Sequence, residues 1–225
     1  MSLFEGRGLA CRRGERWVFA ELGFALPAGG ALLLTGPNGS GKSSLLRVMA
    51  GLLPPAAGSL LWEGAPLRAE PEAHRRRLHF LGHLEAVKPV LSARENLAFW
   101  AALRGGAADP GAQMRALDAF GLAPLADVPA RLLSAGQKRR LALARLLATP
   151  AELWLLDEPS VGLDSQSVEA LAAAMAGHRL TGGRIVASSH LPLDLPGAES
   201  LDLEAFAATS AEPWPEADWG EGDAA

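Results

Sequence analysis

Five short apolar runs alternate with helical patterns along the chain, and this alternation predicts an α/β domain. The runs have the length of buried strands and span residues 31–35, 60–62, 78–81, 153–156 and 184–189. Residues 42–53 and 166–178 have the spacing of polar and apolar positions that is typical of helices. A strand, a glycine-rich turn and a helix therefore follow one another in residues 31–53, which is the setting that a phosphate-binding loop requires.

A long helical segment, from about residue 92 to residue 149, interrupts this alternation. It opens with Ser92, and Glu95 follows three residues later, which predicts a capping box at a helix N-terminus. We expect a helical subdomain over about residues 88–138, inserted into an α/β domain that spans residues 1–206. No repeat at the periods of solenoid proteins is present in the sequence.

The chain contains no segment that we expect to cross a membrane. Its first 17 residues have no apolar core, so a signal peptide is not expected. The most apolar stretch, residues 141–156, is interrupted by charged residues and a proline, and it falls short of the roughly 20 apolar residues of a span. Residues 207–225 are rich in alanine, proline and acidic residues, which predicts a flexible tail. Its Trp214 and Trp219 are either solvated or part of a docking element.

Composition narrows the class of protein. The chain is 49% hydrophobic and 20% charged, as is usual for a globular protein with a large core. The net charge of −4 gives no electrostatic reason to expect a nucleic-acid partner. Cys11 is the single cysteine, so the chain has no internal disulfide and no cysteine-based zinc site, and it fits a reducing compartment.

A phosphate-binding motif follows the first predicted strand of the α/β pattern. Residues 36–43 match the pattern G-x-x-x-x-G-K-S, in which glycines let the backbone N–H groups turn toward phosphate and the helix N-terminus adds positive charge. We expect Lys42 to reach the β- and γ-phosphates and Ser43 to ligate Mg²⁺. The predicted ATP-binding residues are Gly36, Pro37, Asn38, Gly39, Ser40, Gly41, Lys42, Ser43 and Ser44. The motif alone indicates a nucleoside triphosphate, and the absence of N-K-x-D argues against a GTPase.

Two carboxylates end the predicted strand at residues 153–156 and complete this site. Asp157 suits the Mg²⁺ shell, directly or through water. Glu158 would project beyond the metal and polarise the attacking water. A strand that ends in two acids is the second half that a preceding phosphate loop needs, and this favours function over a solvated strand end.

Three further motifs give the chain a resemblance to the ATP-binding cassette (ABC) family. Residues 133–137 (LSAGQ) resemble the ABC signature, usually LSGGQ, and residues 160–164 (SVGLD) resemble the D-loop. His190, after two serines at a predicted strand end, resembles the switch histidine. The resemblance extends from near the start of the chain to about Leu203. It implies an ABC ATPase with a RecA-like mixed sheet core and an inserted α-helical subdomain.

The signature has its own physical logic. Ser134 and the backbone N–H of Gly136 would form a second anion-binding helix N-terminus. In the ABC family this segment binds the γ-phosphate held by the other subunit, so the resemblance implies a dimer of two copies with ATP between them. The residues expected to act in trans are Ser134, Ala135, Gly136 and Gln137, with Asp164 in the D-loop. Glu158 and His190 are the expected catalytic residues, and ATP and Mg²⁺ the expected ligands.

Two positions depart from the ABC pattern. His83 stands where the family usually has the Q-loop glutamine, and a neutral imidazole can replace it in part because it accepts one hydrogen bond and donates another. The aromatic residue that usually stacks on adenine falls near Arg13. A guanidinium can stack on a base, so Arg13 or Arg16 is the candidate, with Trp17 as a rival.

Three stretches, residues 11–19, 45–53 and 80–100, resemble the ATP-binding subunits of bacterial haem exporters used in cytochrome c maturation. This resemblance implies multi-helix membrane partner subunits and a place at the cytoplasmic face of the inner membrane. Partners would handle haem, because the chain lacks the C-x-x-C-H attachment motif. The alternatives are an ABC ATPase for another cargo, such as a drug or lipid, and a soluble ABC assembly ATPase.

Overall fold

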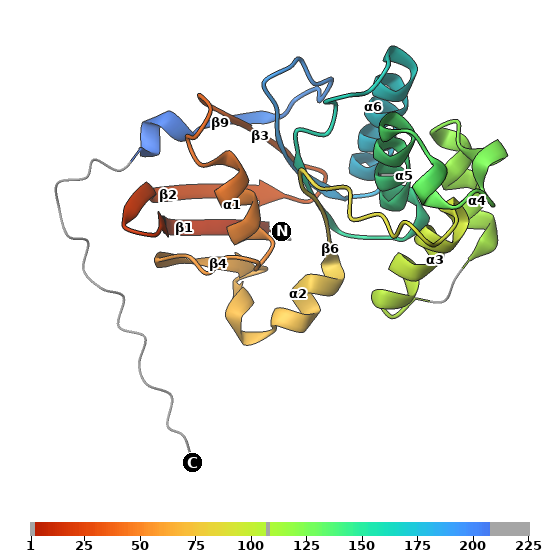
Figure 1. The fold of residues 1–225 in the computed structure, drawn as a ribbon. Coiled ribbons are helices and arrows are strands. Elements are labelled where there is room, and N and C mark those ends of the chain that lie inside the picture. Colours follow the sequence, from red (N-terminus) through yellow and green to blue (C-terminus); the bar gives the residue numbers. More distant parts are fainter. Residues whose placement is uncertain (1–2, 107–108, 208–225) are drawn as a thin grey trace.

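The computed structural model describes residues 3–106 and 109–207 (Figure 1). Trp214, Trp219 and the rest of the predicted tail beyond Ala207 lie outside the described residues. The described part is arranged in layers, in which an antiparallel sheet, the helix α1, a parallel sheet and a group of helices follow one another (Figure 1).

The antiparallel sheet has the strand order β2-β1-β4-β5. Its strands are β1 (Leu3–Arg13), β2 (Arg16–Pro27), β4 (Ala57–Trp62) and β5 (Ala65–Pro66). In the hairpin of β1 and β2, Gly14 takes a positive φ of 62°, which a tight hairpin turn favours. The sequence pattern did not predict β1 or β2, because register shifts at three points of β1 break the alternation of inward and outward residues.

The parallel sheet carries the predicted site at the carboxyl ends of its strands. Its order is β6-β7-β8-β3-β9. The strands are β3 (Ala31–Thr35), β6 (Leu78–Leu81), β7 (Leu153–Asp157), β8 (Arg184–Ser188) and β9 (Glu199–Asp202). All neighbouring pairs are parallel, so the segments that follow β3, β6, β7 and β8 all leave the sheet on the side where the carboxyl ends of the strands lie.

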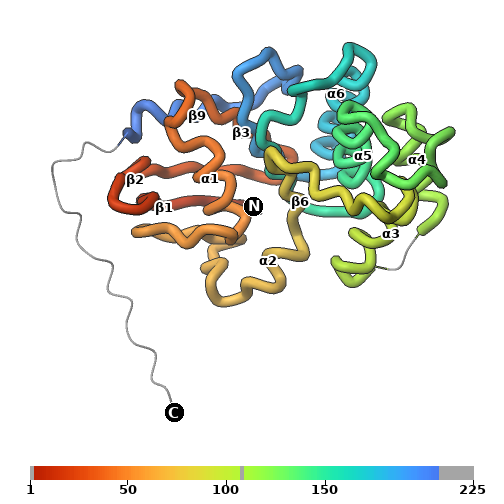
Figure 2. Tube along the Cα trace, viewed as in Figure 1, coloured from red at the N-terminus to blue at the C-terminus, as the bar shows by residue number. Residues whose placement is uncertain are grey.

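The helices cover both faces of the parallel sheet (Figure 2). The α-helices are α1 (Lys42–Met49), α2 (Pro71–Arg77), α3 (Ala93–Leu103), α4 (Pro110–Ala119), α5 (Ala135–Ala148) and α6 (Ser165–Leu180). Short 3₁₀ turns are η1 (Leu67–Ala69), η2 (Ala123–Leu125), η3 (Ala130–Leu132) and η4 (Leu203–Phe206). The predicted capping box at the start of α3 is confirmed, since the Ser92 hydroxyl accepts from the Glu95 N–H at 3.2 Å and Glu95 accepts from the Ser92 N–H at 2.7 Å.

Strand β7 shows how the apolar runs build two cores. Leu153 and Leu155 face the core that α1 shares with the antiparallel sheet, whereas Trp154 and Leu156 face the core formed with α3 to α6. Successive side chains of a strand point to opposite faces, so a strand covered on both sides must be apolar throughout. The continuous run that predicted this strand reflects that double burial.

Several predicted boundaries were wrong. The helix expected over residues 42–53 ends at Met49, because Gly51 takes a positive φ of 68° and the chain turns there. The strand expected over residues 60–62 begins at Ala57. Its early part was hidden by Gly58, where a side chain would lie 2.3 Å from the carbonyl oxygen of Gly8. The remaining predicted strands and the helix at residues 166–178 agree with the structure within two residues.

Arginine side chains cover the outer edge of β6, which is an edge strand. Alternate carbonyl groups along this edge accept hydrogen bonds from α5 and from the residue that ends α3, the pairs being Leu78 with Arg104, Phe80 with Arg145 and Gly82 with Arg139. Buried carbonyl groups without a partner are costly, so these guanidinium groups satisfy an edge that no strand covers. They also tie the helical layer to the sheet.

His79 on β6 is held as a neutral ring inside this arrangement. Its Nε2 donates to the carbonyl oxygen of Thr149 at 3.0 Å, and its Nδ1 accepts from Arg104 at 3.3 Å. Burial, followed by the nearby Arg104 guanidinium, lowers the pKa of His79 from 6.5 to about 3. Burial also lowers the pKa of His178 to about 4 and that of His74 below its ordinary value.

These histidines predict acid sensitivity of the fold. Below pH 6.5 these histidines take up protons in the unfolded chain but not in the folded chain. The free energy of unfolding therefore decreases as the pH is lowered, by about 1 kcal/mol per pH unit near pH 5.5 for each such histidine. Urea unfolding between pH 6.5 and pH 5 measures this slope. In His79→Gln the amide can still donate to Thr149, but the proton that unfolding takes up at this position is lost, so the slope should decrease by the contribution of about one proton. An unchanged slope would contradict a neutral His79 in the folded chain.

Candidate functional site

The predicted residues come together where the parallel strands end at their carboxyl ends, which is the carboxyl edge of the sheet. The phosphate loop follows β3, Asp157 ends β7, and His190 lies two residues beyond β8. Asp157 and Ser188 are directly opposite each other in the pairing of β7 with β8. Residues far apart in the sequence therefore meet because parallel strands end at one edge.

The phosphate loop has the backbone that its glycines predict. Gly36, Gly39 and Gly41 have positive φ values of 119°, 83° and 108°. At Gly41 a side chain would also lie 2.5 Å from Val18 of β2, so the close approach of the hairpin excludes larger residues there. Gly41 gives α1 no side-chain cap, which leaves the first N–H groups of the helix available for an anion.

The loop fits a bound triphosphate. The Lys42 ammonium donates to the carbonyl oxygens of Gly36 and Pro37 at 2.7 and 3.0 Å, which holds it over the loop. The hydroxyl of Ser40 is buried and has no hydrogen-bond partner. An ammonium over the loop, an uncapped helix N-terminus and an orphaned hydroxyl together provide donors for phosphate oxygens. Ser43 follows as the second residue of α1.

Ser188 holds Asp157, which ends β7, and Glu158, which follows it. Its hydroxyl donates to Asp157 at 2.7 Å, and Asp157 is buried at 6% exposure. Its hydroxyl and carbonyl oxygens both accept from the Glu158 N–H, at 3.1 and 3.2 Å. Ser188 was not predicted from the sequence, where its one signal is its position directly before the Ser189-His190 pair.

Glu158 and His190 are in contact, as two catalytic candidates should be. The Glu158 carboxylate accepts from the His190 backbone N–H at 3.2 Å and lies 2.9 Å from Nδ1 of its ring. Glu158 has a positive φ of 49°, a conformation that residues other than glycine rarely adopt and that clusters at functional sites. A carboxylate oriented by an imidazole at the mouth of a phosphate site can polarise a water molecule.

The signature segment opens α5 with a second capping box. The Ser134 hydroxyl accepts from the Gln137 N–H at 3.2 Å, and the Gln137 side chain accepts from the Ser134 N–H at 2.8 Å. The Ser134 hydroxyl can still donate its own proton. Ala135 is exposed and Gly136 half-buried, so this helix end is accessible to an anion from another molecule.

Asp164 has a structural role in addition to its predicted D-loop role. It is the N-cap of α6 and accepts from the Ser167 N–H at 2.8 Å. Hydrogen bonding by the side chain and then by the backbone N–H of Ser167 lowers the pKa of Asp164 below its ordinary value. The part that Asp164 would play toward a second subunit stays a prediction.

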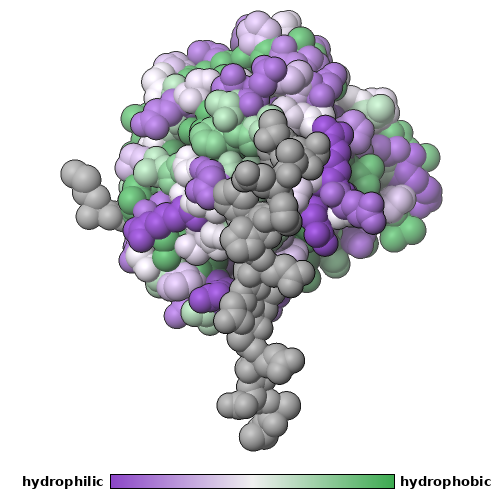
Figure 3. All heavy atoms as spheres, turned by 90° about the vertical axis from the view of Figure 1, so that its left-hand side faces the viewer, coloured by the Kyte–Doolittle hydropathy of each residue, from purple (hydrophilic) through white to green (hydrophobic). Residues whose placement is uncertain are grey.

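His83 and the adenine candidates lie at the surface. His83 is exposed, two residues beyond β6, at the edge where β7 also ends. Arg13 and Arg16 are exposed at the turn between β1 and β2. The face of the molecule on the left of Figure 1 shows hydrophilic and hydrophobic residues interspersed (Figure 3). Trp17 lies beneath Arg12, 6.0 Å from ring centroid to guanidinium, and precedes the Val18 that approaches the phosphate loop. The structure thus brings β2 to the phosphate loop, and an adenine contact by Arg13, Arg16 or Trp17 stays a prediction.

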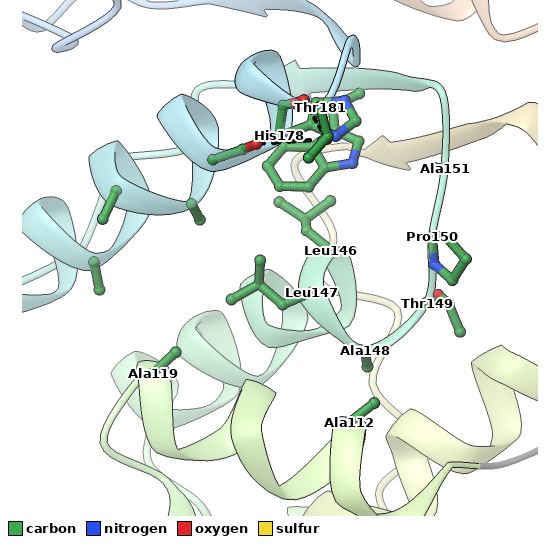
Figure 4. A pocket seen from close by; sticks show the side chains of 15 residues that line it. Ala112, Ala119, Leu146, Leu147, Ala148, Thr149, Pro150, Ala151, His178 and Thr181 are labelled. Atoms are coloured by element: carbon green, nitrogen blue, oxygen red, sulfur yellow. Dashed lines mark hydrogen bonds between the residues drawn. The ribbon is translucent and has the colours of Figure 1, made fainter.

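An apolar pocket of about 620 Å³ lies elsewhere, between α4, α5 and α6 (Figure 4). Leu146, Leu147 and small residues such as Ala112 and Ala119 line it, and none of the predicted site residues does. At one side the ring of His178 stacks on Trp154 with 4.0 Å between centroids. Phosphoryl chemistry requires charged and polar groups, so the carboxyl edge is the candidate site.

Similarity to known proteins shows the family to which the chain belongs. The family described as ABC transporter matches residues 19–161. The structure is similar to that of the ABC transporter ATP-binding protein of Pyrococcus furiosus, with a TM-score of 0.81 and 25% identity over 92% of this chain and all of that one. The chain therefore belongs to the ABC transporter family, with the ATPase fold that the sequence predicted. Membership implies ATP binding and membrane partner subunits.

Two relatives show to which group within the ABC transporter family the chain belongs. A protein of Paramagnetospirillum magneticum is 57% identical over 94% of this chain and 99% of its own length, and one of Rhodospirillum rubrum is 58% identical over 92% and 88%. Both are named cytochrome c biogenesis ATP-binding export protein CcmA. Within the ABC proteins, the chain belongs to this CcmA family, as the resemblance of residues 11–19 and 80–100 indicated.

The two capping boxes allow the signature role to be tested. Ser134→Ala and Ser92→Ala each remove an N-cap and should each cost about 1 kcal/mol of folding free energy. Only Ser134→Ala should also lower ATP turnover, by at least about tenfold, because Ser134 would donate to developing phosphate charge. Melting temperatures and ATP hydrolysis rates of both variants separate the loss of a helix cap from a role of Ser134 in ATP turnover. Equal turnover in the two variants would limit Ser134 to capping.

Proposed function

We propose that the chain is the ATP-hydrolysing subunit of a membrane complex that exports or releases haem for c-type cytochrome biogenesis. The observation that carries this proposal is the identity of 57% along 99% of a protein named for cytochrome c biogenesis export. The site supports the hydrolytic part, since it combines a phosphate loop with a buried aspartate and a histidine-oriented glutamate.

The roles of the site residues follow from their positions. Lys42 and the N-terminus of α1 would hold the β- and γ-phosphates, and Ser43 and Asp157 would hold Mg²⁺. Bound Mg²⁺ would supply charge neutralisation at the phosphate oxygens. Glu158 would polarise the attacking water, and His190 would orient Glu158. His83 would replace the usual glutamine beside this site.

The proposed active unit contains two copies of the chain and membrane subunits. Each nucleotide would lie between the phosphate loop of one copy and residues 134–137 of the other, and the accessible capped end of α5 supports this arrangement. Among residues 3–106 and 109–207, no helix is long and apolar enough to cross a bilayer. We place the chain at the cytoplasmic face of the bacterial inner membrane, with haem handled by the membrane partners.

ATP-driven closure and release would drive the complex. Closing the two copies on ATP excludes water and places donors around the γ-phosphate, which is how phosphoryl transfer is accelerated. Hydrolysis removes the phosphate that bridges the copies and lets them separate. The segment after β6, residues 82–89, joins the catalytic edge to the helical layer and would pass this motion to the membrane subunits.

Two rivals remain distinguishable. An ABC ATPase for a drug or lipid would have the same site, because membrane subunits choose the cargo. A soluble assembly ATPase would co-purify with soluble proteins in place of membrane subunits. The fate of c-type cytochromes therefore separates the proposal from both rivals.

Glu158→Gln should trap the ATP-bound dimer. Loss of the carboxylate should lower turnover by about 100-fold or more while the phosphate loop still binds ATP. Size-exclusion chromatography with ATP and Mg²⁺ should then show a stable dimer. Lys42→Ala, which loses the phosphate-binding ammonium, should remain monomeric. A Glu158→Gln protein with normal turnover would remove Glu158 from the proposed role.

The cargo assignment is tested in the host cell. We expect that replacing the native copy by Glu158→Gln abolishes covalently bound haem in c-type cytochromes and leaves b-type haems intact. Haem staining of membrane proteins and difference spectra measure both. Unchanged c-type cytochromes would overturn the haem assignment and leave the ABC ATPase assignment standing.

A further inference from the structure

Arg139 connects the signature helix to the catalytic edge. It lies in the second turn of α5 and is 7% exposed. Its Nη2 donates to the main-chain oxygen of Glu158 at 2.7 Å, and its Nη1 donates to that of Gly82 at 3.5 Å. Ser134 caps the same helix five residues earlier, about 7.5 Å away along the axis. One rigid element therefore carries the signature segment and touches Glu158.

The bond from Arg139 completes the restraint of Glu158. Ser188 already holds the N–H of Glu158, and Arg139 holds its carbonyl group. The residue between these two bonds has the unusual positive φ of 49°. Because the main chain sets the direction in which the side chain leaves, the two bonds together direct the Glu158 carboxylate toward His190.

Covering the edge of β6 accounts for only the longer of the two hydrogen bonds of Arg139, the bond to Gly82. Arg104 and Arg145 donate to carbonyl groups within the strand, whereas the shorter bond of Arg139 goes to Glu158 and its longer bond to Gly82 beyond the strand end. Burial of the Arg139 guanidinium lowers its pKa, and the charges of Glu85 and Asp157 oppose that effect. A buried guanidinium has lost its water and depends on hydrogen bonds to main-chain oxygens, so moving these oxygens away from it would cost free energy.

We propose that Arg139 is a positioning residue that fixes Glu158 to the signature helix. It links the carboxylate of one ATP site to the helix end that would contact the other ATP site across the dimer. A displacement of α5 on closure would pass directly to the Glu158 main chain. This proposal rests on the proposed roles of Glu158 and of the signature.

The first test compares Arg139→Lys and Arg139→Gln with Arg145→Lys as the matched control, in the full chain purified with its membrane subunits. Either Arg139 variant should lower kcat for ATP by about tenfold and leave KM within about twofold, because loss of one charged hydrogen bond acts on positioning alone. Arg145→Lys should leave kcat within about twofold. Unchanged kcat in the Arg139 variants, or an equal fall in Arg145→Lys, would overturn the proposal.

A double-mutant cycle shows whether Arg139 acts through Glu158. Adding Arg139→Gln to Glu158→Gln should change the residual turnover by no more than about twofold, whereas a second tenfold fall would assign Arg139 to another step. The melting temperature of Arg139→Gln should stay within about 5 °C of the native value. Unfolding of both Arg139 variants would assign this residue to stability and refute positioning. These readouts use ATP alone, so they stay independent of the cargo assignment.

Discussion

Strand β7 is hydrogen-bonded to β6 on one edge and to β8 on the other, and both of its faces are buried. This pairing determines the site, because the register that places Leu156 beside Ala187 also places Asp157 beside Ser188. A shift of one residue would exchange the two apolar faces and separate the carboxylate from its hydroxyl donor. The same burial that stabilises the sheet therefore sets the geometry of the candidate site.

Residues adjacent in sequence were predictable, whereas contacts between distant segments were not. The loop from Gly36 to Ser43 and the acids after β7 form local patterns whose chemistry depends on spacing alone. The approach of Val18 to Gly41 depends on a bulged hairpin with no clear period, and the bond from Ser188 to Asp157 depends on strand register. The subfamily resemblance, in contrast, was visible in residues 80–100 because short segments carry it.

Main-chain carbonyl groups accept hydrogen bonds from the buried cations of the helical layer. Burial and the nearby Arg104 lower the pKa of Arg145 to about 10, so it remains charged at neutral pH. It rests 4.4 Å from the Trp100 ring and donates to Phe80. Charge-assisted bonds of this kind offset the cost of removing a guanidinium from water. The helical layer is thereby fastened to the sheet at β6, the strand next to β7.

The reciprocal bonds between Ser134 and Gln137 are formed within a single copy of the chain. The end of α5 is thus preorganised before any nucleotide or second subunit arrives. Ordering a recognition element during association consumes binding free energy, and a preformed element avoids that loss. In a dimer of two copies, the N-terminus of α5 would need no ordering on association. The binding free energy of ATP would then be available for association itself.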